Sequence, residues 1–134
     1  ISFFDTADIY GPDNGEPFGA SEALLGRLFA DDRALRDRMV LASKGGIVIG
    51  TPYDSSPAYI ASAIDASLQR LGTDRLDLWQ IHRPDILTHP QEVARALDDA
   101  VAAGKVRAVG VSNYTAAQVA ALSRFLTVPL ASLQ

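Results

Sequence analysis

The chain of 134 residues is long enough for one ordinary domain, and its 48% hydrophobic and 21% charged residues are typical of a globular protein. A net charge of −4 with no basic stretch argues against nucleic-acid binding, which requires clustered lysine and arginine. The absence of cysteine excludes disulfides and thiolate chemistry for these residues, and no apolar run approaches the roughly 20 residues of a membrane helix. We therefore expect a cytoplasmic protein without a nucleic-acid or membrane partner; the sequence leaves its oligomeric state open.

Short apolar runs predict five strands, and helical patterns separate them. The strands are expected at residues 1–4, 39–43, 76–81, 106–111 and 129–133. The helices are expected at residues 21–29, 57–71, 90–103 and 115–126. The alternation of strand and helix predicts parallel strands joined by right-handed crossovers. Because the chain has neither a dinucleotide-binding glycine fingerprint nor a P-loop, we favour a (β/α)8 barrel over an open nucleotide-binding sheet.

Local signals mark the ends of the predicted helices. Ser56 followed by Pro57 predicts a capped start, and Gly72 predicts the end of the same helix. Thr115 and Gln118 fit a capping box.

Other segments carry weaker expectations. The first helix is expected to bury one apolar face, made of Leu24, Leu25, Leu28 and Phe29. Residues 11–15 predict a loop, residues 31–38 a charged and exposed short helix, and residues 45–52 a flexible glycine-rich loop. Trp79 is expected to pack against a helix, on the strand face opposite His82.

Polar side chains stand where the strands end. Asp5 and Tyr10 follow the first strand, Lys44 the second and His82 the third. In a barrel these strand ends share one mouth. A free tyrosine has a pKa near 10, and a neighbouring ammonium group lowers it. We therefore expect Tyr10 to donate a proton to a carbonyl oxygen, Asp5 to hold Lys44 in place, and neutral His82 to orient the carbonyl.

A carbonyl that becomes an alcohol also needs a hydride, which no side chain supplies, so the site implies a nicotinamide cofactor. Ser112 and Asn113 follow the fourth strand, and Gln134 ends the fifth. These short polar side chains suit the carboxamide of a nicotinamide.

Ordered motifs run from one end of the chain to the other. They are Asp5-Thr6-Ala7 with Tyr10-Gly11, Gly19-x-Ser21-Glu22-x-x-Leu25-Gly26, Ser43-Lys44, Leu71-Gly72-Thr73-Asp74 with Asp77-Leu78, Ile81-His82, Gly104-Lys105-Val106-Arg107 and Gly110-Val111-Ser112-Asn113. Together they resemble the aldo-keto reductase family. The resemblance implies a (β/α)8 barrel that reduces aldehydes or ketones with NADPH, of which residues 1–134 would be a partial domain covering about five βα units, the second to sixth strands.

The resemblance also implies roles for individual residues. Tyr10 would be the general acid, Lys44 and Asp5 would tune it, and His82 would orient the substrate. The nicotinamide amide would contact the remaining strand-end residues, Ser112, Asn113 and Gln134. Arg83 is a candidate for lining the substrate pocket.

Two other functions fit the same residues. One is a regulatory subunit that holds the cofactor and turns over slowly. The other is a Schiff-base enzyme with Lys44 as nucleophile, which Asp5 disfavours because a charged lysine is a poor nucleophile. His82 and His89 beside Asp85 lack the spacing of a metal site, so no metal is expected.

The ends of the chain predict that it is a fragment. There is no initiator methionine, and both ends fall within or beside predicted strands. Five barrel units would leave two unpaired sheet edges, so we expect this stretch alone not to fold stably.

Overall fold

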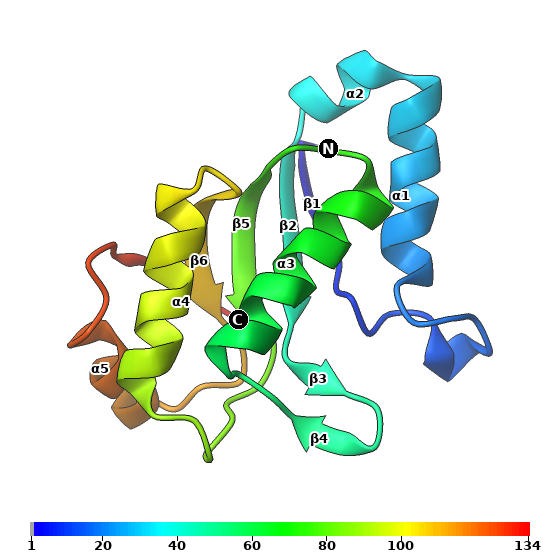
Figure 1. Ribbon diagram of the computed structural model, residues 1–134. Coiled ribbons are helices and arrows are strands. Elements are labelled where there is room, and N and C mark those ends of the chain that lie inside the picture. Colours follow the sequence, from blue (N-terminus) through cyan, green and yellow to red (C-terminus); the bar gives the residue numbers. More distant parts are fainter. Residues whose placement is uncertain (1) are drawn as a thin grey trace.

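A computed structural model describes residues 2–134 (Figure 1). One sheet contains β1 (Phe3–Asp5), β2 (Val40–Gly45), β5 (Leu76–Ile81), β6 (Val106–Val111) and β7 (Leu130–Leu133). The strands are ordered β1-β2-β5-β6-β7, and every neighbouring pair is parallel. The predicted parallel sheet is therefore confirmed. The predicted first strand is confirmed for Phe3 and Phe4, and Ile1 lies outside the described residues.

Helices cover one face of this sheet (Figure 1). They are α1 (Ala20–Asp31), α3 (Pro57–Leu71), α4 (Pro90–Ala102) and α5 (Ala116–Ser123). The core lies between the two layers. Its strand side chains include Leu41, Trp79, Ile81, Val109 and Val111, all fully buried. Because alternate residues of a strand face opposite sides, this pattern leaves Lys44, Gln80 and Ser112 on the other face of the sheet.

The predicted helix ends are confirmed. The Ser56 hydroxyl accepts a hydrogen bond from the Tyr59 amide at 3.3 Å, with Pro57 in the first turn. Gly72 ends α3 in the left-handed conformation, with φ of 62°. The capping box of Thr115 and Gln118 begins α5, one residue before Ala116.

The expected apolar face of the first helix is wrong in part. Phe29 is buried, but Leu24 is 53% exposed and Leu28 is 46% exposed. The side of α1 that meets α3 and β2 instead buries Glu22, whose charge is paired with Arg70 of α3. Glu22 thus lies on the inward side of α1 together with Phe29, and its charge is paired with a residue of another helix.

The segment after β2 forms a hairpin rather than the expected flexible loop. Strand β3 (Ile47–Val48) pairs antiparallel with β4 (Thr51–Tyr53). The turn contains Gly50 with φ of 88°, a conformation that glycine adopts without strain. The predicted loop at residues 11–15 contains a short 3-10 helix, η1 (Pro12–Asn14).

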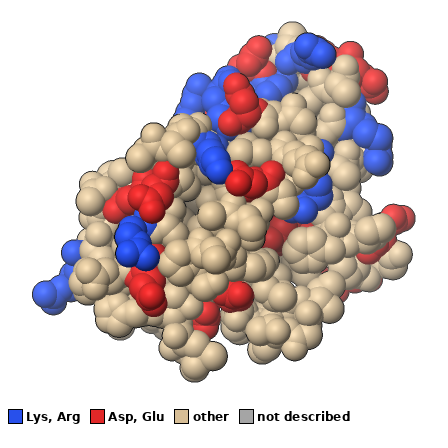
Figure 2. All heavy atoms as spheres, viewed as in Figure 1, with Lys and Arg blue, Asp and Glu red and all other residues tan. Residues whose placement is uncertain are grey.

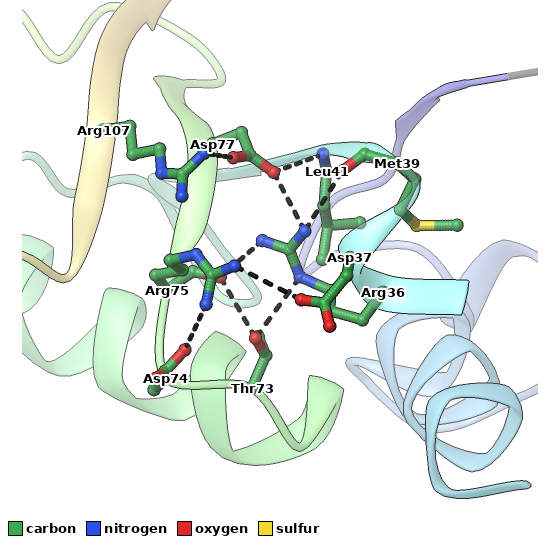
Figure 3. A network of polar contacts seen from close by, with 9 residues as sticks. All are labelled: Arg36, Asp37, Met39, Leu41, Thr73, Asp74, Arg75, Asp77 and Arg107. Carbon is green, nitrogen blue, oxygen red and sulfur yellow. Dashed lines mark hydrogen bonds and ion pairs between the residues drawn. The ribbon is translucent and has the colours of Figure 1, made fainter. Parts of the chain in front are cut away.

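The short helix expected at residues 31–38 exists as α2 (Arg33–Asp37), but it is not wholly exposed. Arg36 is buried and makes an ion pair with Asp77 of β5 at 3.0 Å (Figure 3). Asp77 also accepts a hydrogen bond from the Leu41 amide at 2.9 Å and pairs with Arg107 of β6 at 3.1 Å. The Asp77 carboxylate thereby joins α2, β2 and β6 near the amino-terminal ends of the strands.

On the face shown in Figure 2, acidic and basic side chains are interspersed and form no continuous basic area. Among the helices of residues 2–134, none is both long enough and apolar enough to cross a bilayer.

Candidate active site

Four residues expected to carry the chemistry lie at the carboxyl end of the parallel sheet. Asp5 ends β1, Tyr10 lies in the loop that follows, Lys44 is the penultimate residue of β2, and His82 directly follows β5. Parallel strands present their carboxyl ends at one edge, so three separate units of the chain contribute to one place.

Lys44 joins two of these units. Its side chain is 1% exposed, and Nζ forms an ion pair with the Asp5 carboxylate and donates to the Thr6 carbonyl at 3.0 Å. Nζ also lies 5.3 Å from the centroid of the Tyr10 ring. This distance is that of a cation–π contact between the ammonium group and the ring.

Tyr10 and His82 lie side by side. Their ring centroids are 5.8 Å apart, with an angle of 82° between the ring planes, which is an edge-to-face contact. Tyr10 is 40% exposed and is therefore accessible to a substrate at the mouth. Burial, with the charges of Lys44 and Arg83, lowers the pKa of His82 to about 4, against an opposing effect of Asp5. The imidazole is therefore neutral at pH 7, so one ring nitrogen carries a proton and the other accepts.

Sequence reasoning missed a functional neighbour, Gln80 of β5. Its Nε2 donates to Asp5 Oδ1 at 3.3 Å, and its Oε1 accepts from the Ser132 hydroxyl at 2.9 Å. Gly110 of β6 lies between Gln80 and Ser132 in the sheet. A Cβ at Gly110 would come within 2.0 Å of Ser132 Oγ. The signal was present in the sequence, since Gln80 is two positions before His82 and faces the same side of a strand that is apolar apart from Asp77 and Gln80.

Ser112, Asn113 and Gln134 form a second polar group beside the first. The Asn113 side-chain amide donates to the His82 carbonyl and to Ser112 Oγ, both at 2.9 Å, and the Gln134 amide donates to Asp5 Oδ2 at 3.1 Å. Asn113 has φ of 62°, a conformation uncommon outside glycine that recurs at functional sites.

The free hydrogen-bonding capacity of this second group matches a carboxamide. Within residues 2–134, the Ser112 hydroxyl proton and the side-chain carbonyl oxygens of Asn113 and Gln134 have no partner. One donor and two acceptors complement the carbonyl and amino groups of a nicotinamide amide. The residues present therefore fit the cofactor that the sequence implied.

Arg83 is the least engaged of the expected site residues. It directly follows His82 and is exposed. In the described part of the chain it makes no ion pair or hydrogen bond with the other site residues, and it acts on His82 through its charge.

Comparison with known proteins identifies the family. The whole chain, residues 1–134, matches the Aldo/keto reductase family. A 6-dehydroglucose reductase from Novosphingobium aromaticivorans is 62% identical over 134 residues, which cover 100% of this chain and 44% of the relative. An L-glyceraldehyde 3-phosphate reductase from Escherichia coli K12 is 39% identical over 119 residues, covering 86% of this chain and 33% of the relative.

Solved structures agree with the sequence comparisons. A glycerol dehydrogenase from Gluconobacter oxydans superposes with a TM-score of 0.85 at 35% identity, over 99% of this chain and 40% of that one. An aldo/keto reductase from Klebsiella pneumoniae, solved in complex with NADP and acetate, has a TM-score of 0.74 at 35% identity, over 92% and 38% of the two chains.

The chain therefore belongs to the aldo/keto reductase family, and its relatives are named as reductases and oxidoreductases. Its five-stranded sheet is part of the (β/α)8 barrel of that family. The chain spans less than half the length of the curated relatives described above.

Proposed function

We propose that the protein containing this chain reduces an aldehyde or ketone to an alcohol, with NADPH as the source of hydride and Tyr10 as the proton donor. The observation that carries the proposal is the meeting of Asp5, Tyr10, Lys44 and His82 from three units of the chain at one sheet edge. The names of the reductase relatives and the NADP complex of the Klebsiella neighbour support it.

Each of the four side chains has a distinct part in this proposal. The Tyr10 hydroxyl gives its proton to the carbonyl oxygen, and the Lys44 ammonium stabilises the phenolate left behind. Asp5, fixed by its contacts with Lys44 and Gln80, keeps that ammonium in place. Neutral His82 donates a hydrogen bond to the carbonyl oxygen. Proton donation of this kind contributes a factor of about 10² to 10⁴ in rate.

The second polar group would hold the cofactor. Ser112, Asn113 and Gln134 would bind the nicotinamide carboxamide, and the bound nicotinamide would supply the hydride. Arg83 is assigned to the wall of the substrate pocket because it is exposed next to His82. We further propose that residues 1–134 form part of one barrel domain, that the protein is cytoplasmic, and that its partners are small carbonyl compounds rather than nucleic acid or membrane.

The environment of Lys44 disfavours the Schiff-base alternative. A nucleophilic amine must be uncharged and accessible, whereas this side chain is 1% exposed and its Nζ is paired with Asp5 and bonded to the Thr6 carbonyl.

The test is oxidation of NADPH by the natural full-length protein with a panel of aldehydes that includes 6-dehydroglucose and glyceraldehyde. Tyr10→Phe should lower kcat by about 10² to 10⁴-fold while NADPH binding is retained. Tyr53→Phe is the matched control, because Tyr53 is exposed on the β3–β4 hairpin and should leave kcat unchanged.

The outcomes separate the competing functions. Turnover by the wild type that Tyr10→Phe leaves intact would refute the role of Tyr10. Tight NADPH binding without any turnover would favour the regulatory subunit. Failure to bind any nicotinamide cofactor would contradict both the reductase and the regulatory-subunit functions.

A further inference from the structure

A buried carboxylate outside the site links the elements that carry the proton donor and its ammonium partner. Glu22 lies in the first turn of α1 and is 0% exposed. Its Oε2 accepts from Arg70 Nε of α3 at 2.6 Å, and its Oε1 accepts from the hydroxyl of Ser43 in β2. Ser43 directly precedes Lys44, so Glu22 is bonded to the strand that presents the lysine.

The same turn of α1 also holds the backbone of Tyr10. The Ser21 amide, next to Glu22, donates to the Tyr10 carbonyl at 3.2 Å. Two short hydrogen-bonded paths therefore start from residues 21 and 22. One leads to Tyr10, and the other leads through Ser43 to Lys44.

Arg70 contacts the loop that returns from Tyr10 to α1. Its guanidinium carbon lies 5.7 Å from the centroid of the Phe18 ring, a cation–π contact. Gly19, with φ of 82°, leaves room for the arginine, since a Cβ at Gly19 would come within 2.4 Å of Arg70 Cδ. Arg70 of α3 therefore contacts both this loop and Glu22.

Stability is a weak reason for placing this ion pair inside the protein. The desolvation of two charges offsets most of their attraction, and apolar side chains of similar volume often stabilise a core as well. Directional bonds, in contrast, fix the relative position of the groups they join. A misplacement of about 1 Å in a reacting group can cost on the order of 10² in rate.

We propose that Glu22 and Arg70 are positioning residues that set Tyr10 relative to Lys44. Neither side chain has a contact with the four residues at the mouth in the described part of the chain; they act through Ser21, Ser43 and the 11–19 loop. This inference rests on the proposed function of Tyr10 as proton donor.

The test uses the natural full-length protein with Glu22→Gln, Arg70→Lys and Arg70→Ala. Glu22→Gln keeps the shape and loses the charge, and we expect kcat to fall about tenfold while KM for NADPH changes by less than about twofold. Arg70→Lys should recover part of the kcat that Arg70→Ala loses.

A second readout does not depend on turnover. Hydrogen–deuterium exchange of the peptide covering residues 8–22 reports the Ser21 amide, and it should become faster in Glu22→Gln and Arg70→Ala. The matched control is Lys105→Ala, which removes an exposed ion pair between Lys105 and Asp65 of α3. It should change neither exchange in this peptide nor kcat.

The proposal would be overturned if a variant lost stability while its kcat per folded molecule and its exchange in residues 8–22 matched those of the wild type. If Glu22→Gln does not fold, the same measurements on Arg70→Lys test the proposal in its place. If the wild type itself shows no turnover, the proposed function fails. The exchange experiment then still tests whether Glu22 and Arg70 hold the segment that contains Tyr10. Unchanged exchange in the variants would contradict that part of the proposal.

Discussion

Replacing Asp77 by asparagine should destabilise the protein without disturbing the proposed site. The Asp77 side chain is 12% exposed, and its partner Arg36 is 9% exposed, so the variant leaves a buried arginine without its carboxylate (Figure 3). Breaking a buried pair costs about 3–5 kcal/mol. Arg36 keeps the carbonyls of Met39 and Arg75 as acceptors, and asparagine can still accept from the Leu41 amide, so we expect a loss of about 2–3 kcal/mol.

The assay is urea unfolding of the natural full-length protein, with Arg107→Ala as the matched control. Arg107 contacts the other oxygen of the same carboxylate, but its side chain is 62% exposed, so its removal should cost less than about 1 kcal/mol. The kcat of folded Asp77→Asn should equal that of the wild type, since Asp77 lies near the opposite end of the strands from Lys44. A loss for Asp77→Asn no larger than that for Arg107→Ala would refute the reasoning.

Two further predictions follow from buried contacts of α1 and of the loop before it. Gly26→Ala should destabilise the protein by about 2 kcal/mol or more, because the new Cβ would lie 2.1 Å from the Arg70 carbonyl oxygen and would push α1 away from α3; unchanged urea unfolding would contradict this. Burial, and then the charge of Glu22, raises the pKa of Asp8 from 3.8 to about 7. The folded state therefore binds this proton more tightly than the unfolded state, and the contribution of Asp8 to stability is lost as pH rises through about 7. Asp8→Asn should thus be more stable than the wild type at pH 8 by a few kcal/mol and should flatten the dependence of stability on pH between about 4 and 7. An unchanged slope in that window would contradict the assignment of the slope to Asp8.

Signals from residues close together in the sequence were enough to predict most of the fold. The strands at 76–81 and 106–111 match the structure residue for residue, because a sheet covered by helices requires short apolar runs there. The boundaries of α3 followed from Ser56, Pro57 and Gly72, each of which acts within one turn of the helix end. These features depend on neighbours in sequence, so the sequence alone could predict them.

Features set by distant partners were not predictable in the same way. The buried Glu22 of α1 is paired with Arg70, which is 48 positions away, and no helical pattern predicts that partner. The burial of Arg36 could not be predicted from its charged segment, because its partner Asp77 lies on β5. At the candidate site, the strand ends could be grouped from their topology, whereas the contact of Gln80 with Asp5 required the register of the sheet.

Asp5, near the start of the described chain, is bonded to its last residue, since Gln134 donates to Asp5 Oδ2 across 129 positions. During synthesis at about 5–20 residues per second, Asp5 leaves the ribosome roughly 6–26 s before Gln134 does. Lys44 and Gln80, its other side-chain partners in the described chain, leave the ribosome within that interval. The three partners of this carboxylate are therefore available together only after the residue that follows β7 has been made.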